Sequence, residues 1–461
     1  MSLDQHTVQD LLESAARRHK VPGASLAVYA DGQLTEAATG VLNVETEVEV
    51  TTDSLFQIGS VTKPYTASLI MQLAVEGRLD LDAPVVASLP ELRLADQESA
   101  ERVTMRHLLS HSSGIEGDHF EDFGRGDDVL ERFVASCAAL GFSHPVGATM
   151  SYCNTGYVIA GRIIERLTGQ TWDTALAERI IGPLGLDHTV TLPEQALRFR
   201  TAHGHVGKLD EPAQLAPVWT LPRSVGPAGL VCATAADMVA FGRWHLDEGR
   251  TADDRQALSA AAVASMQDAV IDIPDQWTLG KSWGLGWILY DWDGRHVYGH
   301  DGATIGQTAW LRIVPDSGVV VGMLANGGRA SDFYRDVYPV LMRELCEITM
   351  PSPLSPPDDL PDVETAAYAG TYERLGVRYE LDVSGTGLAG KAIATGPLAE
   401  IDPDPVEELT LVPVAEGVFA TKDPDEDTWT PMVFYELDDG SPYLHSSARA
   451  TPKVSAKRVA R

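Results

Sequence analysis

The sequence has no long apolar run, few basic residues and only four cysteines. No apolar stretch of about 18 residues occurs in it, so we expect no membrane-spanning helix. The opening residues, MSLDQHTVQDLLESAARRHK, have no basic segment followed by an apolar run, which argues against an export signal. These absences predict a cytoplasmic protein.

Acidic residues dominate the charge: 66 Asp and Glu stand against 35 Lys and Arg, which gives a formal net charge of −31. The field of such a chain repels phosphate backbones and anionic lipid surfaces. We therefore expect neither a nucleic-acid partner nor a membrane partner. The cysteines lie far apart without CxxC spacing, which predicts free structural thiols at Cys137, Cys153, Cys232 and Cys346.

Strand patterns mark both ends of the first 349 residues. The first helix has one apolar face, made by Val8, Leu11, Leu12, Ala15 and Ala16. Two alternating runs follow, joined by the hairpin turn Asp31-Gly32, and near the other end AWLRIV and VVVGMLA flank a turn at 315–318. Helical patterns fill most of the interval up to residue 290. The predicted fold class is α+β, with an antiparallel sheet flanked by helices and a helical region inserted between its two ends.

A proline-rich stretch, MPSPLSPPDDLPD at 350–362, can neither continue a helix nor enter a central strand. It predicts a linker between a domain at 1–349 and a second domain at 363–461. Beyond it, short β-favouring runs such as VRYELDVSG and MVFYELDDG indicate a small antiparallel barrel or sandwich. No catalytic group of residues is visible there, so we expect the second domain to shape the site without supplying chemistry.

The stretch SLFQIGSVTKPYTASLIMQLAVEG places Ser60, Lys63 and Pro64 at the start of a helix. Residues three apart share a helix face, so the amine of Lys63 can reach the hydroxyl of Ser60. Burial at the positive end of a helix lowers the pKa of a lysine and makes it a usable base. Alone, the pattern more often marks a plain helix cap beside a solvated lysine.

Two further stretches strengthen the enzymatic interpretation. MSYCNTGY supplies Tyr152 and Asn154, and YGHDGATIG supplies His300, Asp301 and Gly302. With Ser-x-x-Lys, Tyr-x-Asn and His-x-Gly in this order, residues 8–345 resemble the serine β-lactamase and penicillin-binding-protein superfamily, in its class C and esterase-like branch. YAGTY after the linker looks like the start of the lipocalin-like appendage of several members.

The resemblance implies a role for each matching residue. Ser60 attacks an acyl carbonyl, and Lys63 and Tyr152 relay its proton. Backbone N–H groups of Ser60 and Ala303 hold the oxyanion. Asn154 orients the amide of the substrate.

The substrate-binding strand departs from many relatives. His300 stands where they have a lysine, and a histidine is mostly neutral near pH 7, so recognition of a carboxylate is less expected. Asp301 and Gly302 complete the substrate-binding set, and Gly302 is expected to let the substrate backbone approach closely.

The remaining histidines and Cys153 favour ordinary roles. His107 and His111 are spaced like metal ligands but lack a neighbouring Glu, and His203 and His205 form a weak pair in a loop. Cys153 has no partnered histidine and is expected to be a packing residue. We predict no metal and no cofactor.

The resemblance leaves the acyl acceptor open. The two-domain layout is similar to penicillin-binding-protein-type thioesterases, which release a macrocyclic peptide when its own amine attacks an acyl-serine formed from a peptidyl thioester, and to related amide-forming transacylases. The expected substrate is a small or peptidyl (thio)ester, free or on a carrier protein. The alternative is a hydrolase, an esterase, D-aminopeptidase or weak β-lactamase, in which water attacks the acyl-enzyme. A binding protein that stays acylated is a third interpretation, for which no sequence feature speaks.

Overall fold

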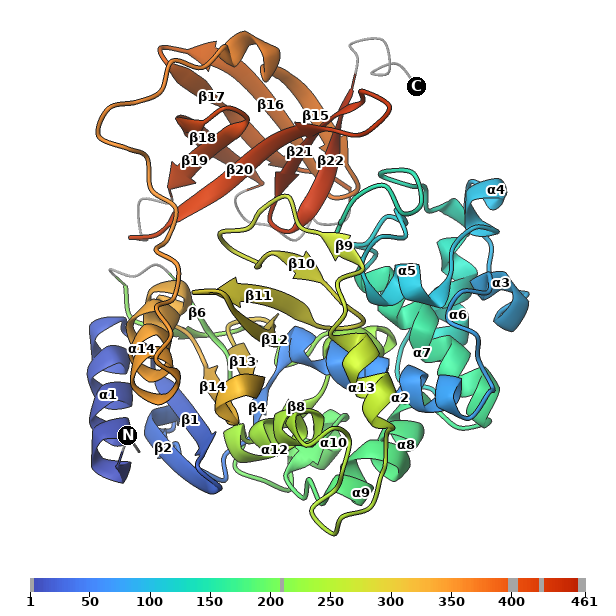
Figure 1. Ribbon diagram of the computed structural model, residues 1–461, viewed down its shortest axis with the longest axis vertical. Helices are drawn as coiled ribbons and strands as arrows, with labels where there is room; N and C mark the ends of the chain where they lie inside the picture. Colours follow the sequence, from blue (N-terminus) through green and yellow to red (C-terminus); the bar gives the residue numbers. More distant parts are fainter. Residues whose placement is uncertain (1–3, 208–210, 397–404, 423–426, 455–461) are drawn as a thin grey trace.

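The computed structural model describes residues 4–207, 211–396, 405–422 and 427–454, and at its centre lies an antiparallel sheet (Figure 1). Within these residues the sheet has nine strands. Their spatial order is β3 (Val48–Glu49), β2 (Gln33–Asn43), β1 (Gly23–Ala30), β14 (Val319–Ala325), β13 (Thr308–Val314), β12 (Arg295–Ala303), β11 (Ile288–Trp292), β10 (Ser282–Trp283) and β9 (Ile271–Asp272).

The sheet joins the two ends of the region that precedes the proline-rich stretch, hereafter the first region, as predicted. β1 pairs with β14 from Ala24 opposite Ala325 to Tyr29 opposite Val320. Both expected turns are present: Asp31 and Gly32 have positive φ angles between β1 and β2, and Gly318 has one before β14. Positive φ at both central residues matches the twist of a two-residue hairpin.

Each face of the sheet is covered by helices that bury an apolar side. On one face lie α1 (Gln5–Arg18) and α14 (Ala330–Cys346) (Figure 1). On the other face lie α2 (Thr62–Val75) and α12 (Ala235–Leu246), followed by the helical region. That region contains α3 (Val85–Ser88), α4 (Gln97–Ala100), α5 (Met105–Leu109), α6 (Val129–Ser136), α7 (Asn154–Thr168), α8 (Trp172–Leu176), α9 (Gly182–Leu184), α10 (Pro193–Ala196), α11 (Gly226–Gly229) and α13 (Ala260–Met266). None of these described helices is long and apolar enough to cross a bilayer.

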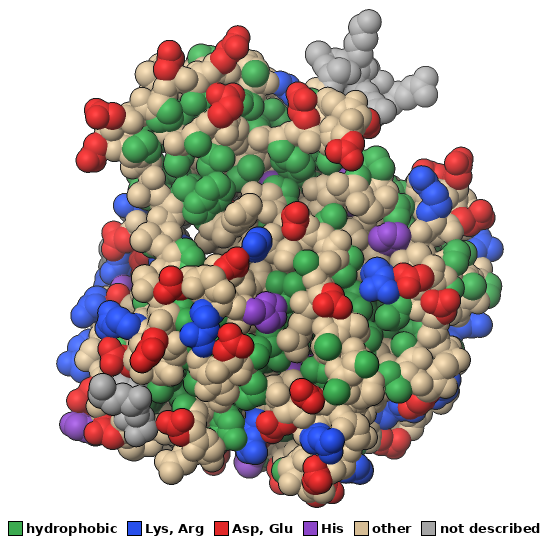
Figure 2. Space-filling view, in the orientation of Figure 1, with side chains coloured by type: hydrophobic (Ala, Val, Ile, Leu, Met, Phe, Trp, Pro, Cys, Tyr) green, Lys and Arg blue, Asp and Glu red, His purple; other side chains and the backbone are tan. Residues whose placement is uncertain are grey.

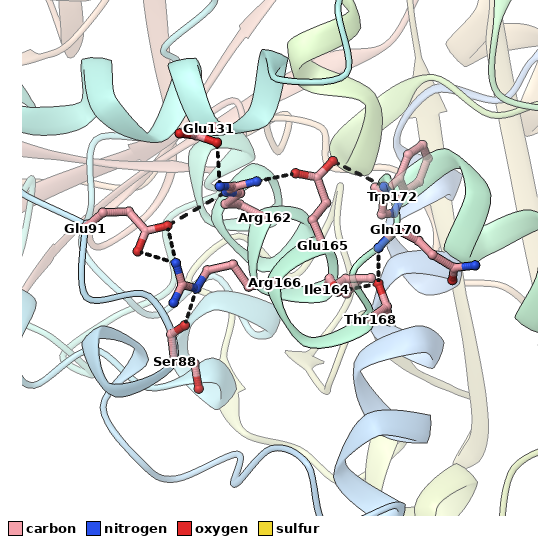
Figure 3. A network of polar contacts seen from close by, with 10 residues as sticks. All are labelled: Ser88, Glu91, Glu131, Arg162, Ile164, Glu165, Arg166, Thr168, Gln170 and Trp172. Atoms are coloured by element: carbon pink, nitrogen blue, oxygen red, sulfur yellow. Dashed lines mark hydrogen bonds and ion pairs between the residues drawn. The ribbon is translucent and has the colours of Figure 1, made fainter.

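Helix α7 is held at its outer side by a charged network (Figure 3). Arg162 binds Glu131 at 2.8 Å and Glu165 at 3.0 Å, and Arg166 binds Glu91 at 3.0 Å. Glu165 also accepts the backbone N–H of Trp172 at the start of α8. Because the first residue of α7 is Asn154, these contacts fix a helix that leads directly into the candidate site.

A closed eight-stranded barrel follows the proline-rich stretch, within the described residues. Its strands are β15 (Gly370–Arg374), β16 (Val377–Ser384), β17 (Gly387–Ala394), β18 (Val406–Ala415), β19 (Val418–Lys422), β20 (Trp429–Glu436), β21 (Pro442–Ser446) and β22 (Arg449–Val454). Large apolar side chains such as Tyr372, Leu411, Phe419 and Leu444 fill its interior. The predicted lipocalin-like barrel is confirmed, although 397–404, 423–426 and 455–461 lie outside the described residues.

The barrel packs above one end of the sheet (Figure 1), and Figure 2 shows a hollow between it and the first region. Two tyrosines reach down from it: Tyr435 shares a hydrogen bond of 3.0 Å with Thr149, and Tyr443 donates one of 3.1 Å to the carbonyl of Ser143. Both partners lie in the loop that leads to Tyr152. The barrel therefore contacts the segment that carries a predicted site residue.

Candidate active site

Ser60 lies in a 3-10 turn, Gly59–Val61, immediately before α2. The serine itself therefore lies in a 3-10 turn, which is wound more tightly than an α-helix, and the α-helix begins after it. Lys63 and Pro64 occupy the first turn of α2. A proline is tolerated in this turn because the first N–H groups of a helix have no partner within it. The side chain of Ser60 is half-buried and that of Lys63 is completely buried.

Lys63 makes three polar contacts. Its Nζ lies 3.0 Å from Ser60 Oγ, 2.8 Å from Asn154 Oδ1 and 2.7 Å from the carbonyl oxygen of Ala228. Burial, reinforced by the positive charge of Arg449, holds the pKa of Lys63 well below its usual range. A neutral amine has two N–H groups, and the two pure acceptors, Asn154 Oδ1 and Ala228 O, use both. Its lone pair is then left for the hydroxyl proton of Ser60.

Tyr152 packs beside this pair. The Nζ of Lys63 lies 4.7 Å from the centroid of the Tyr152 ring. Burial raises the pKa of Tyr152 well above its usual range, and the neighbouring Ser60 hydroxyl opposes this effect only in part. The Oη of Tyr152 has no hydrogen-bond partner of ordinary geometry among the described residues. Ser60, Lys63, Tyr152 and Asn154, predicted from two separate motifs, are thus brought together.

His300 lies on β12 next to the cluster, with its ring 6.4 Å from that of Tyr152. Burial and the charge of Lys63 lower the pKa of His300 to about 3, so it is neutral. Residues 295–299 of β12 pair with β11, whereas 300–303 pair only with β13. On the side away from β13, the backbone N–H and C=O groups of residues 300–303 therefore pair with no described strand. This edge lies beside Ser60 and is suited to an extended substrate. Asp301 points to the opposite face, where it binds the buried Arg312.

The two predicted oxyanion donors belong to segments in direct contact. A Cβ on Gly302 would lie 1.9 Å from the carbonyl oxygen of Ile58 and 3.0 Å from the N of Ser60, and one on Gly59 would lie 2.6 Å from the N of Ala303. Only glycines allow these two backbones to approach so closely. Gly302 therefore allows close contact within the chain, and its expected role in the approach of the substrate stays a prediction.

The barrel supplies a charged group that sequence reasoning missed. Arg449 binds Asp118 through two hydrogen bonds of 2.6 and 2.7 Å, and its guanidinium lies 5.3 Å from the centroid of the Tyr152 ring. Arg374 binds the same carboxylate at 3.0 Å. The barrel thus places two arginines at Asp118, one of them beside Tyr152, and the expectation that it shapes the site without supplying chemistry stays a prediction. No local pattern distinguishes them, because each comes from a separate barrel strand.

His111 and Trp283 were also missed as site residues. The ring of His111 stacks on that of Tyr152 with centroids 4.2 Å apart. The ring of Trp283 contacts the His111 ring edge-on, with centroids 4.6 Å apart. From the sequence an ordinary role is expected for His111, and no local pattern links it to Tyr152. These rings form an apolar wall around the phenol of Tyr152.

The other histidines interact with nearby protein groups. His107 caps α5 by accepting the N–H of Thr104 at 3.1 Å, and His205 accepts the N–H of Val44 at 3.1 Å. Cys153 caps α7, where its sulfur accepts the N–H of Gly156, and burial raises its pKa to about 11. Across the described parts of the chain, no group of three or more His, Cys, Asp or Glu has an arrangement that could hold a metal ion.

Comparison with known proteins agrees with this geometry. Residues 6–344 match the family model Beta-lactamase. Penicillin-binding protein 4 of Amycolatopsis lactamdurans is 51% identical over 378 residues, 82% of this chain and 99% of that protein. SurE, whose structures include one with D-Leu, has a TM-score of 0.80 and 30% identity over 98% of this chain and 99% of its own. A D-stereospecific amidohydrolase from Streptomyces sp. has a TM-score of 0.58 and 28% identity over 73% of this chain and 99% of its own. The chain belongs to the β-lactamase and penicillin-binding-protein superfamily of serine acyltransferases and hydrolases.

Proposed function

We propose that this protein transfers acyl groups through an acyl-Ser60 intermediate and passes them to an amine, as a penicillin-binding-protein-type thioesterase or a related amide-forming transacylase. The observation that carries the proposal is the buried Lys63 amine, 3.0 Å from Ser60 Oγ with its two N–H groups already bound. An amine in this state takes the proton of Ser60 as Oγ bonds to the acyl carbon.

The steps follow from the positions of the groups. The carbonyl oxygen of the acyl donor becomes an oxyanion held by the N–H groups of Ser60 and Ala303. When the carbonyl re-forms, the leaving thiol or alcohol takes the proton from Lys63 through Tyr152. An attacking amine then bonds to the acyl carbon and loses a proton to Lys63 and Tyr152; as the bond between the acyl carbon and Ser60 Oγ breaks, Oγ takes this proton and the serine hydroxyl is restored.

Enclosure of the site supports an amine as the acceptor. The barrel reaches Tyr152, and His111, Trp283 and neutral His300 surround the phenol with rings. An apolar enclosure limits ordered water at the acyl carbon and favours a bound amine held near it. The similarity to SurE extends over both the first region and the barrel, which supports the two-part layout as the functional unit.

We further propose a substrate with a D-configured residue at the reacting end. SurE has been crystallised with D-Leu, and a D-stereospecific amidohydrolase is among the similar structures. Arg374 and Arg449 share one carboxylate, Asp118, which leaves an excess positive charge for the anionic end of a peptide. Delivery of the peptide on a carrier protein, and a cytoplasmic location, belong to the same proposal; the four free, buried cysteines are as expected for a reducing compartment.

The test uses peptidyl thioester mimics with D- or L-configured terminal residues, with and without added amines. Mass spectrometry of the digested protein locates the adduct, and chromatography separates cyclic, amide and hydrolysed products. We expect an adduct on Ser60 that is absent in Ser60→Ala, and amide products from D-configured donors. An adduct elsewhere would reject the nucleophile, and hydrolysis alone across donors and amines would establish the alternative hydrolase.

A further inference from the structure

Three consecutive backbone N–H groups around Tyr152 are bound by two residues from distant parts of the chain. The N–H of Ser151 donates to the carbonyl of His111 at 2.9 Å, and that of Tyr152 donates to the carbonyl of Ala448 at 2.9 Å. The N–H of Cys153 donates to the ring Nδ1 of His111, also at 2.9 Å. The turn is thus held from one side by the first region and from the other by the barrel.

Both holding segments are turns with left-handed backbone conformations. His111 has a φ of 58°, and Ser447 and Ala448, in the turn between β21 and β22, have φ of 49° and 67°. These conformations belong to the turns themselves: Ser447 and Ala448 form a two-residue hairpin turn, and His111 follows the end of α5, where the N–H of Ser112 donates to the carbonyl of His107. Both turns place their hydrogen-bond acceptors at the segment that carries Tyr152.

The tautomer of His111 follows from its bond to Cys153. Because Nδ1 accepts a hydrogen bond, the proton of the neutral ring lies on Nε2, which is buried without a partner among the described residues. Burial, Lys63 and His300 hold the pKa of His111 well below its usual range, so the acceptor form is maintained. The ring face meanwhile stacks on Tyr152.

We infer that His111 is a positioning residue for Tyr152, and that it acts together with the Ala448 carbonyl of the barrel. No described residue forms a hydrogen bond of ordinary geometry with the phenol oxygen, although the Ser60 hydroxyl lies beside it, so backbone bonds and ring stacking help to fix its place relative to Ser60. This inference rests on the proposed function, in which Tyr152 relays protons. A misplacement of about 1 Å costs such a relay about 100-fold.

Two variants of His111 separate its two contacts. In His111→Asn, Oδ1 occupies the position of Nδ1, accepts the N–H of Cys153 and tolerates the left-handed backbone, but the stacked ring is lost. In His111→Phe the ring remains and the acceptor is lost. His245→Leu is the matched control, because His245 is a buried histidine that binds Ser68 at 3.0 Å and does not contact Tyr152.

Acylation of Ser60 by a small activated ester is measured for each variant, alone and combined with Tyr152→Phe. We expect His111→Phe to lower kcat by about 100-fold with little change in KM. The kcat of His111→Asn should stay within about tenfold of the wild-type value. Both losses should largely disappear in the Tyr152→Phe background, because residues that act through one another are not additive. Equal losses in the two backgrounds, for either variant that folds, would overturn the inference, as would a similar loss in His245→Leu.

Hydrogen exchange of the amides at 151–153 gives a readout that does not depend on activity. The amide of Cys153 should be protected in the wild-type protein and in His111→Asn and exchange faster in His111→Phe, whereas the amides of Ser151 and Tyr152 keep their backbone carbonyl acceptors in all three. Unchanged protection of the Cys153 amide in His111→Phe would contradict the inference that the His111 ring holds this segment. If the unchanged protein forms no adduct on Ser60, the proposed function fails, and exchange still decides whether His111 holds Tyr152.

Discussion

Replacing Arg449 with glutamine is expected to shift the acid limb of the pH profile of kcat/KM to higher pH. Lys63 Nζ and Arg449 Cζ lie 4.7 and 5.3 Å from the centroid of the same Tyr152 ring. The two groups are therefore at most about 10 Å apart. At an effective dielectric constant of about 20, two charges at this distance repel each other by about 1.7 kcal/mol.

The direction follows from the form of Lys63 that reacts. Lys63 must be neutral to take the proton of Ser60, and after burial itself the charge of Arg449 is the main cause that lowers its pKa. Without Arg449, Lys63 retains its proton to a higher pH. A free-energy change of about 1.7 kcal/mol corresponds to a decrease of about 18-fold in kcat/KM on the acid side of the profile.

The assay is kcat/KM for a small activated ester across pH, which reports groups of the free enzyme. Arg374→Gln is the matched control, because Arg374 also binds Asp118, at 3.0 Å, but is not among the charges that shift the pKa of Lys63. Thermal unfolding verifies that both variants are folded. The reasoning fails if the acid limb of Arg449→Gln stays in place or moves to lower pH, or if Arg374→Gln shifts it equally.

Further predictions concern the relay, the barrel, the glycines and Asp118. Lys63→Ala and Tyr152→Phe should each slow acylation by about 100-fold or more, and near-native turnover of folded Tyr152→Phe would show that the relay is drawn wrongly. A folded chain truncated at 362 should be labelled at Ser60 by a fluorophosphonate at least about tenfold more slowly, because Ala448 and Arg449 are gone; an unchanged rate would show that the barrel is dispensable for acylation. Gly302→Ala should unfold at a clearly lower temperature than Gly141→Ala, since its Cβ would lie 1.9 Å from a carbonyl oxygen whereas that of Gly141 meets nothing nearer than the Glu116 carboxylate at 3.6 Å; equal melting points would contradict this. Burial alone would raise the pKa of Asp118, but Arg449 and Arg374 outweigh it and hold this pKa below its usual range. Asp118 therefore stabilises the fold fully above its unfolded pKa of about 4 and less as the pH falls through its folded pKa, a dependence that Asp118→Asn should remove from denaturation curves.

Local chemistry made much of this molecule predictable. Asp31-Gly32 indicated a hairpin because few residues accept positive φ at two successive positions, and the structure has it. Ser60 and Lys63 were linked by helical spacing alone, and they are in contact. Sheet, helical region and barrel followed from where strand and helix patterns change along the chain.

Contacts between distant segments could not be predicted in the same way. Arg449 carries no local signal, because its role depends on how one barrel hairpin meets Tyr152. The importance of His111 depends on a backbone angle and on a stacked ring, neither of which its sequence neighbours specify. Gly59 and Gly302 allow two backbone segments to approach closely, and this role depends on the packing of segments that are far apart in the sequence.

The hairpin between β21 and β22 also sets when the site becomes complete. Ribosomes make Ser60 and Lys63 long before Ala448 and Arg449, and domains fold largely in the order of synthesis. A nascent first region therefore carries its serine and lysine without the carbonyl and the cation that meet Tyr152. We therefore expect Ser60 to react more slowly with acyl donors until the barrel folds and docks against the segment that carries Tyr152.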